Sequence, residues 1–440
     1  MKKSVRKIVS IITTVAFAFS MISVNAFAAQ KTVKTNGELN IKFTVAERSG
    51  VNVKDYFFRR GIAIEKGLLY SPKNICLTEN GVPVKNSVAE TLETYDDGSI
   101  RWLLVSANID LKANEFKTMV VTNGNSATKK AVVTRGVGSL KVKSEKIDMT
   151  IGSKGIESIK YEGKEKLAGG NINLYATVGG QTTYLKATEF EIIKNNESYS
   201  KFKISGRLKK DILGEMYITL ANDASKLQID HTIVVENHID IEGTGLEIGV
   251  NGSGMTDGIV SEDFLDIGNM QLATYDNTRF SGATNAVGKT GYVIEKSVVK
   301  FAPIVNGKPY TYWDGSSRTA HLYICFEGDG EDYSKMLALP PNPVADNEQY
   351  EKAGEIKNSF ASPLVEDFIY TLNEGYRRGN GRYEAGVLTG FNPMTNELQI
   401  ARSMPGETEY NYGIAYMQTG NEELFRQIVD MSEFRCDVLV

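Results

Sequence analysis

The chain has 440 residues, a formal net charge of -4, three cysteines and three histidines. This length leaves room for about two to four domains that bury their own cores. So few cysteines exclude a disulfide-based scaffold, and the mildly acidic balance argues against nucleic acid or anionic lipid as a partner.

The N-terminus predicts a secretory signal peptide at residues 1–28. A basic start is followed by an apolar run and by small residues suited to signal peptidase, namely Lys2, Lys3, Arg6 and Lys7, then residues 8–24, then Ala26-Phe27-Ala28. Loss of these four positive charges takes the net charge from -4 to -8. We therefore expect a secreted, extracellular protein without membrane association after cleavage, with a single-pass anchor as the alternative.

Short alternating runs at residues 37–125 predict an N-terminal module of short β-strands. In NICLTENGVPV, Asn80-Gly81 is the signature of a tight β-hairpin. In YDDGSIRWLLV, Asp97-Gly98 predicts a second turn, which leads into a strand around Trp102. The polar stretch at residues 122–131 then predicts a linker.

Residues 134–330 predict a large antiparallel β-sandwich. Alternating runs broken by glycines, from SLKVKSEKIDMTIG to RTAHLYICFEG, are typical of many short strands joined by tight turns. Cys325 lies in the apolar run LYICF, which predicts a buried thiol.

Residues 331–440 predict a linker followed by helices. Ser362-Pro363 is a start signal for a helix over PLVEDFIYTLNEGYRRG. ETEYNYGIAYMQTGNEELFRQIVDMSEF predicts a helical hairpin in which Gly420 ends the first helix and Asn421 caps the second. Because two helices with apolar stripes cannot enclose a core alone, we expect a C-terminally truncated helical domain. The alternative is a hairpin that folds back on the sandwich.

No motif predicts a nucleotide or metal site. ATNAVGKT at residues 283–290 fits a permissive phosphate-loop pattern, but an alternating strand follows it where a phosphate loop requires a helix. His231 and His238 are seven residues apart, so in a strand their side chains face opposite ways. The sequence predicts no cofactor and leaves calcium open.

The stretch YTYWDGSSRTAHL, residues 310–322, concentrates reactive side chains. In a strand, Arg318 and Ala320 face one way, and Thr319 and His321 face the other. Aromatic rings beside an arginine suit a sugar with a carboxylate, because rings stack on sugar faces and a guanidinium clamps the carboxylate. An ion pair of Arg318 with Asp314 that closes a turn over a packed Trp313 is the equal alternative.

Three regions resemble the exo-rhamnogalacturonan lyase and YetA-like family of secreted pectin-degrading proteins. They are RRGIAIEKGLLYS through YDDGSIRWLLV, YWDGSSRT, and LPPNPVADNEQYEKAG with ETEYNYGIAYMQTGNEELF. The resemblance implies an N-terminal RIFT-type β-barrel at residues 37–125, a central β-sandwich and an α/α toroid, of which only the first helices are present. Ala320 and Asn411 depart from the family pattern as we know it.

The resemblance implies β-elimination at a galacturonate of rhamnogalacturonan, an acidic plant-type polysaccharide. Such a reaction needs a cation against the uronate carboxylate, a base and an acid. The implied catalytic residues are Arg318 as clamp, with His321 and Tyr312 as base or acid. Substrate binding would fall to Trp313, Asp314, Arg377, Glu409 and Tyr410.

Two further functions stay open. One is a non-catalytic secreted carbohydrate-binding or structural fragment, which a missing toroid would favour. The other is a glycoside hydrolase, which needs two carboxylates at a defined separation. We expect a lyase-like protein whose activity is impaired in a truncated chain.

Overall fold

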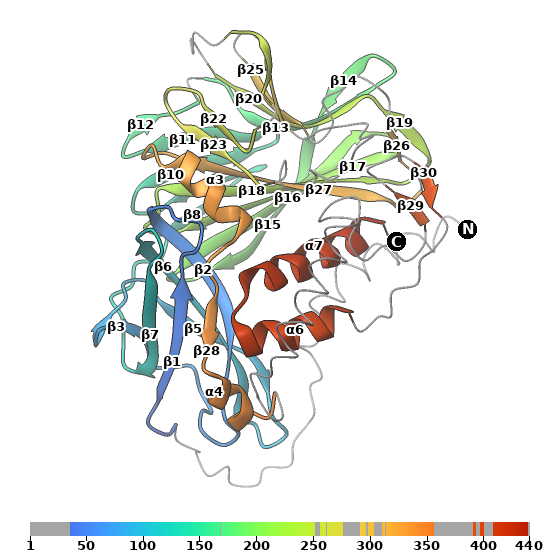
Figure 1. Cartoon of the computed structure of the whole chain (residues 1–440). Coiled ribbons are helices and arrows are strands. Elements are labelled where there is room, and N and C mark those ends of the chain that lie inside the picture. Colours follow the sequence, from blue (N-terminus) through green and yellow to red (C-terminus); the bar gives the residue numbers. More distant parts are fainter. Residues whose placement is uncertain are drawn as a thin grey trace, which may run out of the picture. The chain divides into compact units, whose positions relative to one another are not determined.

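The computed structural model describes residues 36–167, 169–250, 256–260, 262–275, 291–295, 298–302, 310–312, 314–355, 390–392, 397–399 and 408–438. The predicted fold class, mainly β with a C-terminal α portion, is confirmed (Figure 1). The predicted helix over residues 363–379, the phosphate-loop match at 283–290, Trp313 and Arg377 lie outside the described residues.

The N-terminal strands form two antiparallel sheets. The described strands of the first, in sheet order, are β28 (Pro343–Ala345), β1 (Asn40–Ala46), β7 (Phe116–Asn123), β3 (Ile75–Glu79) and β4 (Val82–Pro83). Those of the second are β2 (Val53–Ala63), β6 (Ile100–Leu111) and β5 (Val88–Thr94). The hairpin at Asn80-Gly81 is confirmed, with positive φ values of 50° and 77° joining β3 to β4.

These two sheets do not close into a barrel in the described part of the chain, which corrects the predicted barrel geometry. β2 pairs with β6 alone, and β1 pairs with β7 and with β28. The short strand β28 comes from far along the sequence and pairs with the edge of β1. The backbone N–H and C=O groups at that edge therefore have partners although the sheets do not close into a barrel.

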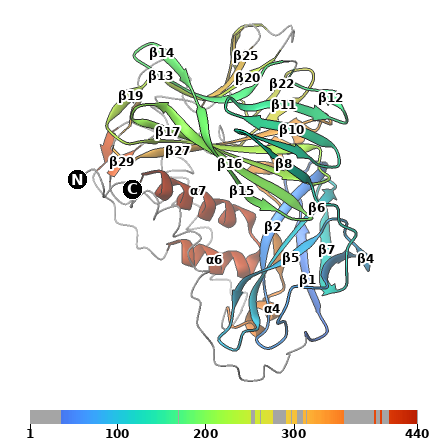
Figure 2. The ribbon, with the colours of Figure 1, turned by 180° about the vertical axis from the view of Figure 1, so that it is seen from behind.

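Two larger sheets form the predicted sandwich (Figure 2). The described order of the first is β21 (Gly258–Val260), β24 (Gly291–Glu295), β25 (Val298–Ala302), β20 (Gly243–Gly249), β13 (Ile172–Val178), β11 (Gly155–Tyr161), β10 (Ile147–Gly152), β9 (Ser139–Lys143) and β8 (Val132–Gly136), with β12 (Lys164–Glu165) on β11 and β14 (Gln181–Tyr184) on β13. That of the second is β15 (Lys186–Asn195), β16 (Tyr199–Lys209), β17 (Ile212–Ala221), β18 (Lys226–Val235), β27 (Ser317–Cys325), β23 (Gln271–Ala273) and β22 (Phe264–Asp266). Two separate ribbons pair β19 (Ile239–Ile241) with β26 (Tyr310–Tyr312) and β29 (Gly390–Asn392) with β30 (Glu397–Gln399).

The sheet that contains β27 has two different faces. Its inner face packs apolar side chains such as Phe202, Ile229 and Leu322 into the sandwich core. Its outer face carries polar and aromatic side chains, among them Lys201 and His321. The alternation predicted for residues 318–321 is therefore observed, and it puts His321 on the outer face.

Four helices are described, and the hairpin among them matches the prediction. They are α3 (Gly330–Ala338), α4 (Asn347–Lys352), α6 (Thr408–Thr419) and α7 (Glu422–Val438). Gly420 has φ of 64°, and the Asn421 side chain accepts a 3.0 Å hydrogen bond from the Glu423 N–H. None of the described helices has the length and apolarity that a membrane crossing requires. Cys325 is fully buried, as predicted.

Gly155 is required by a close approach between strands. Its φ is 84°, and a Cβ there would lie 2.1 Å from the carbonyl oxygen of Ile172. Gly163 has a similar φ of 77° but no atom within 4 Å of the added Cβ. Gly163→Ala is expected to cost about 1 kcal/mol for the left-handed backbone, and Gly155→Ala about twice that. Thermal unfolding of the two variants tests this, and equal costs would contradict the role given to the close approach.

Candidate functional site

A pocket of about 320 Å³ opens on the outer face of the sandwich sheet. Its walls come from β2, from β16, β17, β18 and β27, and from α3 and α7. The described residues from Gly37 onward belong to one compact unit, which includes all of these walls. The volume lies in the range of small-molecule sites.

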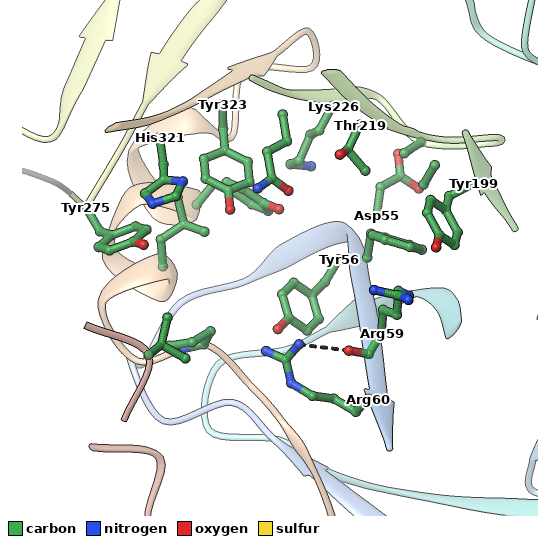
Figure 3. Close-up of a pocket in the computed structure, with 18 of the residues that line it drawn as sticks. Asp55, Tyr56, Arg59, Arg60, Tyr199, Thr219, Lys226, Tyr275, His321 and Tyr323 are labelled. Carbon is green, nitrogen blue, oxygen red and sulfur yellow. Dashed lines mark hydrogen bonds between the residues drawn. The ribbon is translucent and has the colours of Figure 1, made fainter. Parts of the chain in front are cut away.

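Aromatic rings line much of this pocket. Figure 3 shows Tyr275 beside His321 at one end and Tyr199 near Arg59 at the other, with Tyr56 between them. Phe57 and Tyr199 pack with ring centroids 5.3 Å apart. The Tyr56 hydroxyl donates a 2.6 Å hydrogen bond to the carbonyl of Pro341, and burial raises its pKa to about 12, so it stays protonated. Such rings offer flat faces for a sugar.

Three cations in the pocket have no carboxylate within ion-pair distance among the described residues. They are Arg59, Arg60 and Lys201. The guanidinium of Arg59 lies 5.7 Å from the ring centroid of Tyr199, and that of Arg60 lies 4.7 Å from that of Phe425. Arg60 also donates from Nε to the Asn342 side chain at 2.5 Å. Cations without a counter-ion in contact favour an anionic ligand in such a pocket.

Other charged groups at the pocket are neutralised by the protein. Lys226 forms a 2.7 Å ion pair with Asp329. Asp55 sits at a bulge in β2 with φ of 52°, and its carboxylate accepts bonds from Ser225 Oγ at 2.7 Å and Lys146 Nζ at 3.1 Å. Burial opposes ionisation of Asp55, but these partners outweigh it and lower its pKa. Asp55 therefore joins β2 to the sandwich as a fixed anion.

His321 lies at the other end, between two carboxylates. Its Nδ1 is 2.8 Å from Asp230 of β18, and its Nε2 is 3.2 Å from Glu433 of α7. Burial lowers the pKa of His321, but the charge of Glu433 and the hydrogen bonds to both carboxylates outweigh it, and the net pKa is well above the usual value. The ring is thus an imidazolium that donates on both sides.

Tyr275 orders this end of the pocket. Its ring stacks on His321 with centroids 5.5 Å apart and an interplanar angle of 13°. The guanidinium of Arg426 lies 4.1 Å from the Tyr275 centroid, and Arg426 forms an ion pair with Asp430 at 3.3 Å. Helix α7 therefore contributes a cation, Arg426, and an anion, Glu433, to the pocket.

The residues predicted from the sequence are not brought together at this pocket. His321 lines it, whereas Arg318 and Tyr312 are 3% and 1% exposed and do not. Arg318 lies on the opposite face of β27 from His321, beside core residues Ala320 and Leu322. Asp314 is exposed, and its carboxylate accepts a hydrogen bond from the backbone N–H of His238.

Glu409 and Tyr410 lie in the first turn of α6, and their side chains are outside the described residues. The catalytic and binding roles that the sequence suggested stay predictions for all eight residues, namely Arg318, His321, Tyr312, Trp313, Asp314, Arg377, Glu409 and Tyr410. Among the described residues, no group of three or more His, Cys, Asp or Glu side chains could hold a metal ion.

The sequence did not point to Asp230, Tyr275, Arg59, Lys201 or Glu433. Asp230 and His321 are direct cross-strand partners of β18 and β27, 91 residues apart. A weak signal was present, since LQIDHTIVV has the alternation that sends Asp230 to the face opposite its buried neighbours. Without knowledge of which strands pair, that face could not be matched to His321.

No family model and no curated protein matches the chain. Solved structures that match include a protein in glycosyl hydrolase family 38 from Enterococcus faecalis, with 10% identity, a TM-score of 0.43, and coverage of 70% of this chain and 47% of that one. An α-mannosidase from Enterococcus faecalis V583 matches with 9% identity, a TM-score of 0.43, and coverage of 70% and 46%. A YidC insertase matches with 13% identity, a TM-score of 0.27, and coverage of 59% and 55%.

The chain spans about half the length of each of these structures. At these identities and TM-scores, the similarity to the three structures assigns no activity to this chain. The first two are carbohydrate-active enzymes of the hydrolase class, which was the further alternative in the sequence analysis.

These findings correct the resemblance to the exo-rhamnogalacturonan lyase and YetA-like family, and with it the lyase activity on rhamnogalacturonan. No family model matches the chain, and the two glycoside hydrolases named above are not described as lyases. Two of the motifs that suggested this resemblance are local turn signals. Asn80-Gly81 forms a two-residue turn, and Asp97 accepts the 2.9 Å hydrogen bond of the Ser99 N–H that closes the turn at Gly98.

Proposed function

We propose that this chain is a carbohydrate-active, exported protein whose pocket between β2, the outer sandwich face and α7 binds an acidic saccharide. Export rests on the basic, apolar and small-residue pattern of residues 1–28. The saccharide rests on the pocket itself, which is large enough for a sugar and combines ring faces with unneutralised cations.

One observation carries the proposal. Arg59, Arg60 and Lys201 line a pocket with Tyr56, Tyr199 and Tyr323, and none of these cations has a described carboxylate within ion-pair distance. Buried apolar ligands would not need the cations, and a bare inorganic anion would not need the rings. A uronic acid residue uses both, because its ring stacks on aromatic faces and its carboxylate accepts hydrogen bonds from guanidinium groups.

Hydrolysis of such a saccharide is the second candidate, because two carboxylates, Asp55 and Glu433, line the same pocket. The pair formed by Asp230 and Glu433 is less suitable, since the imidazole of His321 lies between them and occupies the space that a glycosidic bond would need. Hydrolysis would therefore require Asp55, which is ionised, to act as a base or nucleophile while it also holds Ser225 and Lys146.

Calorimetry with trigalacturonate and with its methyl ester tests the proposal. The two ligands share a shape and differ in charge, so we expect trigalacturonate to bind about tenfold more tightly or better, as hydrogen bonds to charged groups are worth about 1.5–3 kcal/mol. Binding should weaken as salt rises. Equal affinity for the two ligands, or no binding of either, would refute the proposal.

A reducing-end assay on the same mixtures separates binding from hydrolysis. Release of reducing ends by the wild type would favour the hydrolase. Unchanged trigalacturonate after prolonged incubation, in a protein that binds it, would leave the chain as a binding protein.

A further inference from the structure

The two carboxylates that flank His321 are not equivalent. Asp230 is the register partner of His321 on the neighbouring strand, is 2.8 Å from Nδ1, and is 15% exposed. Glu433 approaches from α7, lies at the longer distance of 3.2 Å from Nε2, and is 27% exposed. Glu433 also lines the pocket, whereas Asp230 does not. One partner is built into the sheet, and the other is carried on a helix at the pocket wall.

Asp230 prepares His321 to receive an anion. By accepting the Nδ1 proton it fixes the orientation of the ring, and it directs the second N–H, at Nε2, toward the pocket side. Stacking on Tyr275, which itself lies under Arg426, restricts rotation of the imidazole. The result is a preorganised charged donor, the type of group that recognises a carboxylate.

We propose that Glu433 occupies the place of the ligand's own carboxylate beside His321, so that an acidic saccharide binds there by displacing it. The inference rests on the proposed function and adds a regulatory contact to it. A carboxylate tethered on α7 competes with the free ligand, and the apparent affinity is reduced by the fraction of molecules in which Glu433 holds the site. Asp230 keeps the imidazole charged and oriented throughout the exchange.

Glu433→Gln tests the displacement. The amide keeps the shape of the side chain but loses the charge that competes for His321, so we expect trigalacturonate to bind about tenfold more tightly than to the wild type. Binding of the methyl ester should not change. Glu348→Gln is the matched control, because it removes the same charge from α4 at a side chain 75% exposed and outside the pocket.

A spectroscopic measurement on the wild type makes the test independent of how well the variant folds. With three histidines in the chain, the imidazole nitrogen signals can be assigned by single substitutions. Addition of trigalacturonate should shift the Nε2–H signal of His321 while the ring stays doubly protonated. An unchanged signal under saturating ligand would contradict displacement.

The outcomes also separate this inference from the proposed function. If the wild type prefers trigalacturonate to its ester but Glu433→Gln binds it no more tightly, displacement is wrong and the saccharide site stands. If neither protein distinguishes the two ligands, the saccharide site itself is wrong, and displacement fails with it.

Discussion

Replacement of His321 with alanine is expected to lower the free energy of unfolding by about 3 kcal/mol near pH 6, because it leaves two carboxylates facing each other without their cation. His321 is 9% exposed, and its partners Asp230 and Glu433 are 15% and 27% exposed, so solvent screens this arrangement little. Chemical denaturation of the variant and the wild type measures the difference. His238→Ala is the matched control, since His238 is exposed, and we expect it to change stability by less than about 0.5 kcal/mol.

The effect should depend on pH in a defined direction. The pKa of His321 is raised above its ordinary value of 6.5, so its contribution to stability is complete below pH 6.5 and is lost as the pH rises through the raised value. The pKa of Asp230 is lowered from 3.8, despite burial, by its bond to His321, so its contribution is present above pH 3.8 and is lost as the pH falls through the lowered value. The difference between wild type and variant should be largest between pH 3.8 and 6.5.

His321→Asn separates charge from hydrogen bonding. Its amide can donate to Asp230 from about the position of Nδ1 but carries no charge and cannot reach Glu433. We expect intermediate stability with no alkaline loss attributable to this residue. The charged and titratable groups that face the ring, Asp230 on β18 and Glu433 and Arg426 on α7, are unchanged by the substitution. If His321→Ala were as stable as the wild type at pH 6, then Asp230, His321 and Glu433 would not form a stabilising ion-pair network.

Local signals in the sequence predicted the elements well. The period of two in residues 317–325 identified the two faces of β27, and Gly420 with Asn421 marked the boundary between α6 and α7. Each of these depends on backbone geometry within a few residues. The same locality explains the misleading family resemblance, since short turn motifs recur wherever the same turn is needed.

Most of the site could not be predicted from the sequence, because it is assembled from segments that lie far apart along the chain. His321 meets Asp230 through strand pairing and Glu433 through packing of α7, and sequence separation hides both contacts. Arg59 comes from β2 of an N-terminal sheet, and the bulge at Asp55 that precedes it has no signature in the residue types. Propensities and periods assign faces to elements, but which faces meet is decided by tertiary packing.

Simultaneous replacement of Arg59 and Lys201 by glutamine is expected to weaken trigalacturonate binding about 100-fold. Each cation contributes about 1.4 kcal/mol or more to a charged ligand, and contributions of separate sites add approximately. Because no described carboxylate pairs with either side chain, their loss should leave stability within about 1 kcal/mol of the wild type, the scale of the cation–π contact of Arg59 with Tyr199. Calorimetry at two salt concentrations measures both the loss and its smaller salt dependence.

Arg207→Gln is the control for this variant. Arg207 lies on β16 like Lys201, but its guanidinium already binds the Glu236 carboxylate through two hydrogen bonds of 2.9 and 3.0 Å. A cation neutralised in this way contributes little field at the pocket, so trigalacturonate affinity should stay within about twofold of the wild type. If Arg207→Gln weakened binding as much as the double variant, the net charge of the sheet would control affinity. The unneutralised pair in the pocket would then have no specific part in recognition, and the ligand would be any polyanion.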